Sequence, residues 1–397
     1  AAACRLTDGE WHATNNVKNL ELKARVTKAL QPEIGFVERL VMFFSNHFSV
    51  GIGKEGATRP TIGQMERSVI RPNVLGSFPA MLQGVTRHPA MLDFLDNSSS
   101  VGPNSTFGRA NGRGLNENLA REILELHTLG VGGGYRQADV LALAKILTGW
   151  SVVRGWEAEL GREGGTPANR GQFIWRPQYH EPGTYTVLGR AYAPDGVMQG
   201  RRALAMLALH PSTAEFLAFK PIQHFITDKP TPQQVDPVAA AYRASRGNIK
   251  STVLAMLNLP AAFTAPLTKL RTPYEIQIAM MRATGRRYLD SQEWAMGSPL
   301  YDLRNSPWEY RTPDGFPDET AYWLRPDGMR VRLETSQLAA WAFQDGRPYT
   351  RTATQMASLV FATTLSAESR LAVSNAQAAD GLRAVATMFM LPEFQWR

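Results

Sequence analysis

The segment from Asn116 to Gly130 concentrates the side chains of this chain that could do chemistry. On a helix with 100° per residue, its polar and aliphatic side chains separate onto opposite faces. The polar face carries Glu117, Asn118, Arg121, Glu122, Glu125 and Thr128. His127 is the exception, because it projects from the middle of the apolar face. Carboxylates and an imidazole can bind a metal or transfer protons, so this helix is a candidate site.

The same helix also has a purely structural interpretation. On a straight helix His127 points roughly 140–160° away from Glu122 and Glu125, so the three side chains cannot converge on one ion. His127 would then face the core, and Arg121 would form i,i+4 ion pairs with Glu117 and Glu125. Both interpretations stay open. As a site, the helix would supply Glu122 and His127 to catalysis and Asn118, Arg121 and Glu125 to substrate binding.

Other segments could add to this site. Asn46-His47 ends an apolar helix between Phe44 and Phe48, where the charged form of the imidazole is disfavoured. That suits a neutral base, and a structural histidine equally well. His180, next to Glu181, lies in an irregular Pro- and Gly-containing segment, where functional residues concentrate. Trp150 could stack on a sugar ring or anchor coil to a core.

Buried histidines from separate segments need hydrogen-bond partners, which they can share when they lie close together. We therefore expect Asn46, His47, Glu122, His127 and His180 to approach one another. His47 and His180 would join the catalytic group, and Asn46 and Trp150 would bind substrate. Of the remaining histidines, His88 and His210 precede helix-opening prolines and are expected as N-caps, whereas His224 is expected in the core.

Composition limits the classes of protein that fit. The 397 residues are 44% hydrophobic and 20% charged, which is typical of a soluble globular protein, and no apolar run is long enough to span a membrane. The net charge of +8 is spread along the chain, which makes nucleic acid an unlikely partner and favours an anionic glycan or envelope surface. The single cysteine, Cys4, excludes an internal disulfide and a cysteine-based zinc site. The chain lacks the GxSxG, Walker A and His-Glu-x-x-His motifs, so metal and cofactor stay unassigned.

Hydrophobic periodicity predicts a mainly α fold, with residues 1–397 forming one large helical domain. Expected helices include Val17–Ala29, Ile34–Phe44, Glu117–Leu129, Pro211–Thr227, Pro273–Ala283 and Ala353–Thr364. Residues 151–194 read as an insertion with two short strands, Gln172–Trp175 and Thr184–Leu188, around a turn at Pro182-Gly183. Residues 288–329 form an irregular, aromatic-rich segment. Both are expected as long loops that cover the helical body.

The chain resembles a bacterial family catalogued as domain of unknown function 1800. The matching motifs are Phe43–Phe48, Asn116–Gly130, Gly134–Val140 leading to Leu147–Trp150, Phe173 through His180 to Gly189, Gly200 through His210-Pro211 to Phe225, Thr312–Pro317 and Pro392–Gln395. Two departures are a short or absent helical region before Asn46-His47, and His180-Glu181 where the family usually has His-Asp.

The resemblance implies a bacterial origin, frequent export and gene neighbourhood with a family similar to alkaline phosphatases and sulfatases; it implies no established reaction. The small residues of Ala1-Ala2-Ala3-Cys4 fit a processed, exported protein, although an arbitrary start explains them as well. Two functions are therefore expected. One is an exported hydrolytic or metal-assisted enzyme acting on an anionic or carbohydrate cell-envelope substrate, periplasmic or extracellular. The other is a non-catalytic envelope or assembly protein that binds a phosphatase- or sulfatase-like partner.

Overall fold

The computed structural model confirms the mainly α fold. It describes residues 8–31, 35–54, 58–264, 268–284, 305–344, 357, 361 and 365–397. The expected helix Ala353–Thr364 and the first part of the aromatic-rich segment, Tyr288 to Arg304, therefore lie outside the described residues, apart from Ala357 and Phe361. No described helix combines the length and the apolar character that crossing a lipid bilayer requires.

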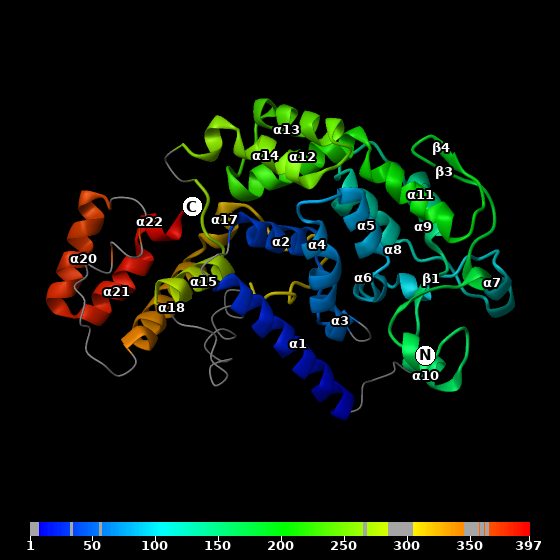
Figure 1. Cartoon of the computed structure of the whole chain (residues 1–397), viewed down its shortest axis with the longest axis horizontal. Helices are drawn as coiled ribbons and strands as arrows, with labels where there is room; N and C mark the ends of the chain where they lie inside the picture. Colours follow the sequence, from blue (N-terminus) through cyan, green and yellow to red (C-terminus); the bar gives the residue numbers. More distant parts are fainter. Residues whose placement is uncertain are drawn as a thin grey trace.

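The first half of the chain forms a right-hand body in Figure 1, with the helices packed in several orientations. Its elements are α1 (Asp8–Ala29), α2 (Phe36–His47), α3 (Thr58–Met65), η1 (Glu66–Ile70), α4 (Arg71–Asn73), α5 (Phe78–Thr86), α6 (Pro89–Phe94), η2 (Asn97–Ser99), α7 (Thr106–Asn111), α8 (Asn118–Glu122), η3 (Ile123–Thr128), α9 (Gln137–Leu147), α10 (Gly155–Leu160), η4 (Pro167–Asn169) and η5 (Pro177–Tyr179).

The second half completes this body and then forms a separate group of helices on the left of Figure 1. The completing helices are α11 (Val197–Ala208), α12 (Pro211–Phe225), α13 (Pro232–Ala244), α14 (Ile249–Leu257) and η6 (Pro260–Ala262). The left-hand group contains α15 (Pro273–Ala283), α17 (Thr320–Trp323), α18 (Pro326–Gln344), α20 (Ala367–Ala379), α21 (Gly381–Met390) and α22 (Pro392–Gln395).

Two buried apolar clusters correspond to these two parts. The large cluster runs from Leu40 to Leu259 and also includes Trp308. A smaller cluster joins α15, α18, α20, α21 and α22 through residues such as Ile276, Val385 and Phe389. A short contact of Val26 and Ala29 in α1 with Tyr274 and Ile278 in α15 connects the two. The long helix α1 and the first turns of α15 thus link the two clusters.

Two small antiparallel sheets form where the sequence predicted strands, but their pairing differs from the prediction. Strand β2 (Phe173–Trp175) pairs with β1 (Trp150–Val152), and β3 (Tyr185–Val187) pairs with β4 (Arg190–Tyr192). The predicted turn at Pro182-Gly183 therefore separates two sheets. The hairpin turn is Leu188-Gly189, both with positive φ, because a two-residue turn of this hand matches the twist of the strands.

Helix α2 lies at the centre of the molecule, between α12 and α15 (Figure 1). Its buried residues Leu40, Val41, Phe43, Phe44 and His47 recur at helical spacing and face the large cluster. The opposite side, with Arg39, Met42, Ser45 and Asn46, faces a cavity. One helix therefore belongs both to the core and to the wall of an open site.

The neighbours of α2 have well-defined starts. In α15 the Thr272 hydroxyl accepts from the Glu275 amide, and Glu275 accepts from the Thr272 amide at 2.9 Å, which is a capping box. In α12 the His210 imidazole accepts from the Ser212 amide, so His210 is the N-cap that its sequence position predicted. His88 caps α6 in the same way. These caps fix where Glu275 and, farther along α12, His224 project.

Of the aromatic-rich segment predicted to be irregular, residues 305–319 run as coil across α2, whereas its end is helical, in α17 and the first turn of α18. Asn46 holds it through two hydrogen bonds: its amide group donates to the Phe316 carbonyl at 2.9 Å, and its carbonyl oxygen accepts from the Phe316 amide at 2.8 Å. Gly315, the residue before Phe316, has φ +73 and packs so close to Asn46 that a Cβ would collide with the Asn46 backbone. Residues 305–319 are thus fastened to α2 at Phe316.

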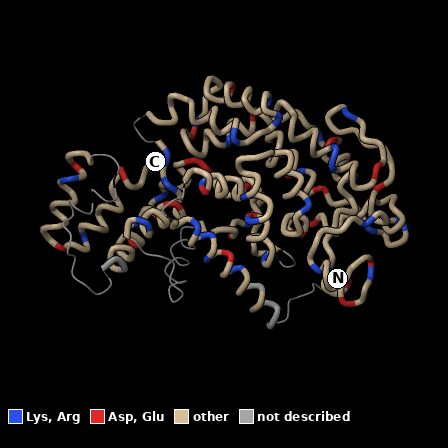
Figure 2. Tube along the Cα trace, viewed as in Figure 1, with Lys and Arg blue, Asp and Glu red and all other residues tan. Residues whose placement is uncertain are grey.

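Lysine and arginine positions alternate with aspartate and glutamate positions along the described parts of the trace in Figure 2. The positive charge therefore does not form one block, in agreement with the sequence pattern.

Candidate functional site

The candidate helix in Asn116–Gly130 is present but is not a regular α-helix. Its first part, α8, continues into η3, a π-helical turn. The i→i+5 bond of the Leu129 amide to the Leu124 carbonyl, at 3.0 Å, shows this wider turn. π-Turns are rare and frequently occur at functional sites. The straight-helix geometry expected from the sequence therefore changes between Glu122 and His127.

The two faces of this helix nevertheless separate as the structural interpretation predicted, except at Thr128, which was expected on the polar face but is buried, with its hydroxyl donating to the Ile123 carbonyl at 2.6 Å. His127 is 1% exposed, whereas Glu122 and Glu125 are half-buried on the outer side. Arg121 forms the expected i,i+4 ion pair with Glu117, at 3.0 Å. Its other contact is with Gln137, and Glu125 lies beside the Tyr135 hydroxyl. Asn118 is exposed.

His47 and His127 lie side by side, with ring centroids 6.3 Å apart. The Nε2–H of His47 donates to the His127 backbone carbonyl at 3.1 Å, which assigns the tautomer of His47. The aromatic rings of Phe48, Phe78 and Phe216 surround His47. Desolvation in this apolar surrounding lowers the pKa of His47 to about 4 and that of His127 to about 3. Both imidazoles are therefore neutral, and His47 ties α2 to η3.

Glu122 has the electrostatics of an acid–base group. Partial burial, followed by repulsion from Glu125 and Asp314, raises its pKa to about 7, although Arg121 opposes the shift. Asp314 belongs to the Thr312–Pro317 turn that Asn46 holds. His47 and His127 are thus in direct contact. The turn held by Asn46 carries Asp314, which lies near enough to Glu122 to raise its pKa.

His180 and Trp150 have different neighbours. The His180 ring packs on Trp175 at 4.8 Å and its Nδ1 lies 3.0 Å from the Thr148 carbonyl oxygen, at the end of α9. Trp150 is fully buried on β1, against Phe173 and Gly200. In this structure Trp150 contributes to the core, and His180 lies among residues that do not touch His47 or His127.

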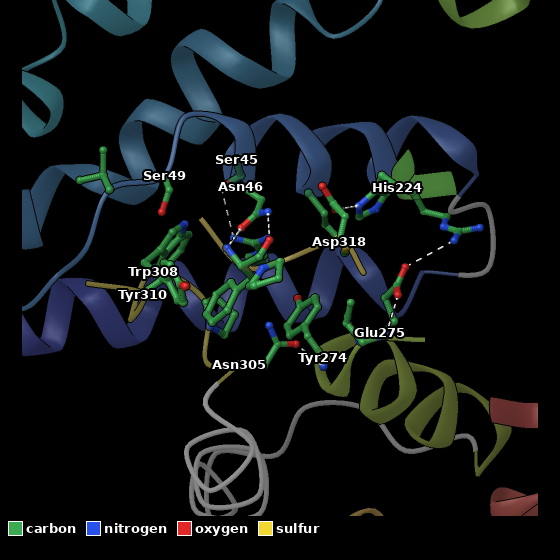
Figure 3. Close-up of a pocket in the computed structure, with 18 residues that line it drawn as sticks. Ser45, Asn46, Ser49, His224, Tyr274, Glu275, Asn305, Trp308, Tyr310 and Asp318 are labelled. Atoms are coloured by element: carbon green, nitrogen blue, oxygen red, sulfur yellow. Dashed lines mark hydrogen bonds and ion pairs between the residues drawn. The ribbon is translucent and has the colours of Figure 1, made fainter. Parts of the chain in front are cut away.

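A cavity of about 80 Å³ opens on the other side of α2. Its walls are α2, the start of α15, His224 of α12 and the coil 305–318 (Figure 3). Asn46 is the only one of the sequence-predicted site residues in this wall. Aromatic side chains line one side (Tyr274, Trp308, Tyr310 and Phe316), and Arg25, Arg39, Glu275 and Asp318 supply charge. An aromatic wall with a few convergent polar groups is typical of a small-molecule site.

His224 and Asp318 form a hydrogen-bonded pair in this wall. The His224 Nδ1 lies 2.6 Å from Asp318 Oδ1 (Figure 3). The Lys220 Nζ lies 2.6 Å from Asp318 Oδ2. Burial alone would raise the pKa of Asp318, but its bonds to His224 and Lys220 lower it below its ordinary value. Burial lowers the pKa of His224, against the opposing pull of Asp318. Asp318 is therefore ionised and His224 neutral near pH 7.

The sequence interpretation assigned His224 to the core and did not single out Lys220 or Asp318. His224 is indeed largely buried, with 13% of its side chain exposed, but it borders the cavity. One signal was present: Lys220 and His224 are four residues apart, so both project from one face of α12. Asp318 follows directly on the Thr312–Pro317 motif.

Within the described residues, no group of three or more His, Cys, Asp or Glu side chains is arranged to hold a metal ion. His224 and Glu122 could transfer protons, and Arg25 and Arg39 in the cavity wall could stabilise negative charge.

Comparison with known proteins gives one assignment. No curated protein and no solved structure matches the chain. Residues 4–396 match the family described as "Protein of unknown function (DUF1800)", and the chain therefore belongs to this family.

Proposed function

We propose that this chain is a hydrolase that acts on an anionic or carbohydrate substrate in the cavity between α2, α15 and residues 305–318. The observation that carries the proposal is the 2.6 Å contact of Asp318 with the His224 imidazole in the wall of that cavity. An imidazole held by a carboxylate is a recurrent general base in hydrolysis.

The hydrogen-bond partners assign the protonation of His224. Because Asp318 is a carboxylate, the Nδ1 of His224 carries the proton and donates to it, which leaves Nε2 free of a proton. In hydrolysis Nε2 would exchange its contact with Arg397 Nη2 for the attacking water, accept a proton from that water and later return it to the leaving group. Lys220 keeps Asp318 ionised throughout, so the orientation of the ring is maintained.

Arg397 places a positive charge beside the proposed base. The Nη2 of Arg397 is 3.5 Å from His224 Nε2 and donates to the His224 carbonyl at 3.0 Å. A guanidinium next to the base stabilises negative charge that develops on the oxygen under attack. Trp308, Tyr310 and Phe316 provide ring faces on which a sugar could stack.

The test is a panel of chromogenic substrates: p-nitrophenyl phosphate, sulfate, acetate, β-glucoside and β-glucuronide. We expect turnover of at least one, and a loss of at least about 100-fold in kcat/KM in His224→Gln, as for removal of a general base. His210→Asn is the matched control, because it changes a histidine on the same helix but preserves a side chain able to cap it. Equal activity in His224→Gln and His210→Asn, with both folded, would contradict the proposal.

The roles predicted for His47, His127, Glu122 and His180 in catalysis stay predictions. Their positions favour support of the site: His47 and His127 fix α2 against η3, and Glu122 lies on the far side of the turn that Asn46 holds. Export and binding of a phosphatase- or sulfatase-like partner also stay predictions from the family resemblance. If none of the five substrates is turned over, the non-catalytic partner role becomes the better account.

A further inference from the structure

A second and larger cavity adjoins the first. Its volume is about 400 Å³, and it shares Arg39, Met42, Tyr274 and Glu275 with the smaller one. Four arginines line it, namely Arg39, Arg271, Arg282 and Arg397, and we call it the arginine cavity. Two glutamates, Glu38 and Glu275, are the acidic residues of its wall.

One of these glutamates is already neutralised from outside the cavity. Glu38 forms a two-pronged ion pair with Arg71, which does not belong to the wall. Glu275 is therefore the carboxylate that faces the arginines. The same oxygen, Oε1, lies 3.4 Å from Arg39 and 3.2 Å from Arg397. This attraction lowers the pKa of Glu275 to about 2 in spite of its burial. One carboxylate cannot balance four guanidinium groups.

Of the four arginines, Arg397 is the one that is both deeply buried and short of acceptors. Its side chain is only 8% exposed; its Nη1 is held by the ion pair with Glu275, and its Nε forms no hydrogen bond to any described residue. Burial, with repulsion from Arg39 and Arg271, lowers its pKa to about 10, so it stays charged at neutral pH. A buried guanidinium that shares its one carboxylate with a second arginine and keeps an unused N–H is costly unless a further acceptor is present. The acceptors that fit a guanidinium best are carboxylate and phosphate-like groups.

The rest of the wall indicates the size and nature of the ligand. Phe36, Met42, Ile278 and Ala279 add an apolar side. The cavity is much larger than a bare inorganic anion and falls in the range of sites for small organic molecules.

We propose that the arginine cavity binds the oxyanion group of a small organic ligand, a phosphate, sulfate or carboxylate, between Arg39 and Arg397. The proposal rests on the proposed function only in making this ligand the anionic part of the substrate; the binding itself is independent of turnover. Because Arg397 also contacts His224, an anion bound there would place the remainder of the molecule next to the acid–base pair.

The experiment is calorimetric titration of the whole chain with four sugars of nearly equal size, at constant ionic strength. The probes are glucose 6-phosphate, glucose 6-sulfate, glucuronate and, as the neutral control, glucose. We expect binding of at least one anionic sugar and at least about tenfold weaker binding of glucose, because charged hydrogen bonds carry the affinity. The order among the three anions identifies the source of the oxyanion.

Variants test whether the arginines are responsible. Arg39→Gln, at a side chain that is 42% exposed and therefore tolerant of change, should weaken binding at least about tenfold, as should Arg397→Gln. Arg170→Gln is the matched control, because it removes the same charge from an exposed pair with Glu159. Glu275→Gln should have the opposite effect and tighten binding, which loss of folding cannot imitate.

Two outcomes would overturn the inference: no anionic sugar binds better than glucose, or binding is equal in the wild type, Arg39→Gln and Arg397→Gln. These outcomes are separable from failure of the proposed function. Turnover of a neutral ester without anion binding contradicts only the arginine cavity, and anion binding without any turnover contradicts only the hydrolase.

Discussion

The replacement of Glu122 by Gln should remove a pH-dependent cost to stability. The pKa of Glu122 rises from its ordinary value of 4.5 to about 7, first through partial burial and then through Glu125 and Asp314. A carboxyl group that binds its proton more tightly in the folded chain destabilises the fold when it ionises. The cost is absent at acid pH, grows as the pH rises above the unfolded value, and is complete above about pH 7. Glutamine carries no charge, so it avoids this cost.

The expected magnitude follows from the shift. Each pKa unit corresponds to about 1.4 kcal/mol, so a fully buried group with this shift would lose roughly 3 kcal/mol. Glu122 is only half-buried, and solvent screening reduces the expected loss to about 1 kcal/mol. Urea unfolding at pH 5 and pH 8 measures it as the change in the free energy of unfolding of Glu122→Gln relative to wild type.

We expect Glu122→Gln to gain about 1 kcal/mol over wild type on going from pH 5 to pH 8. Glu159→Gln, on the exposed pair with Arg170, should show no such change. Asp314→Asn should show part of the gain, because it removes one of the repelling charges. A difference between Glu122→Gln and wild type that is the same at both pH values would refute the raised pKa of Glu122 in the folded chain, and no gain in Asp314→Asn would refute the placement of Glu122 beside Asp314.

Three further changes probe the neighbouring contacts by urea unfolding. Asp318→Asn leaves the Lys220 ammonium without its counter-charge and should cost about 2–4 kcal/mol; a cost under 0.5 kcal/mol, as for an ordinary surface change, would contradict its burial at 4% exposure. Gly315→Ala forces a Cβ onto Asn46 at φ +73 and should cost about 2 kcal/mol or more, whereas Gly132→Ala, with open space around it, should stay within about 0.5 kcal/mol. Asn46→Ala removes both hydrogen bonds to Phe316 and should cost about 1–3 kcal/mol and speed proteolytic cleavage within residues 305–319; unchanged cleavage would show that Asn46 does not hold this coil.

Local pattern predicted a large part of the fold. The periodicity of Asn116–Gly130 predicted the inward position of His127 and the Arg121–Glu117 ion pair, and both are confirmed. The caps at His88 and His210 followed from the proline after each. These features depend on residues within one or two turns of each other, and the sequence displays such relations directly.

Features that depend on distant residues escaped prediction. His224 and Asp318 are 94 residues apart, and nothing local to His224 distinguishes it from a core histidine. The strands near Phe173 and Tyr185 were predicted, but their partners depend on the rest of the fold. The π-turn also escaped, because the periodicity argument assumed a regular α-helix throughout. His180 was expected near His47 from its residue type alone, and the fold gives it other neighbours.

The measurement that tests the central claim most directly is a crystal structure of the chain with the tightest-binding anionic sugar from the titration. The account predicts the oxyanion between Arg39 and Arg397, and the sugar ring in the adjoining cavity within reach of His224 Nε2. A sugar bound instead beside Glu122 and Glu125, with both cavities empty at a concentration that saturates binding in solution, would contradict it.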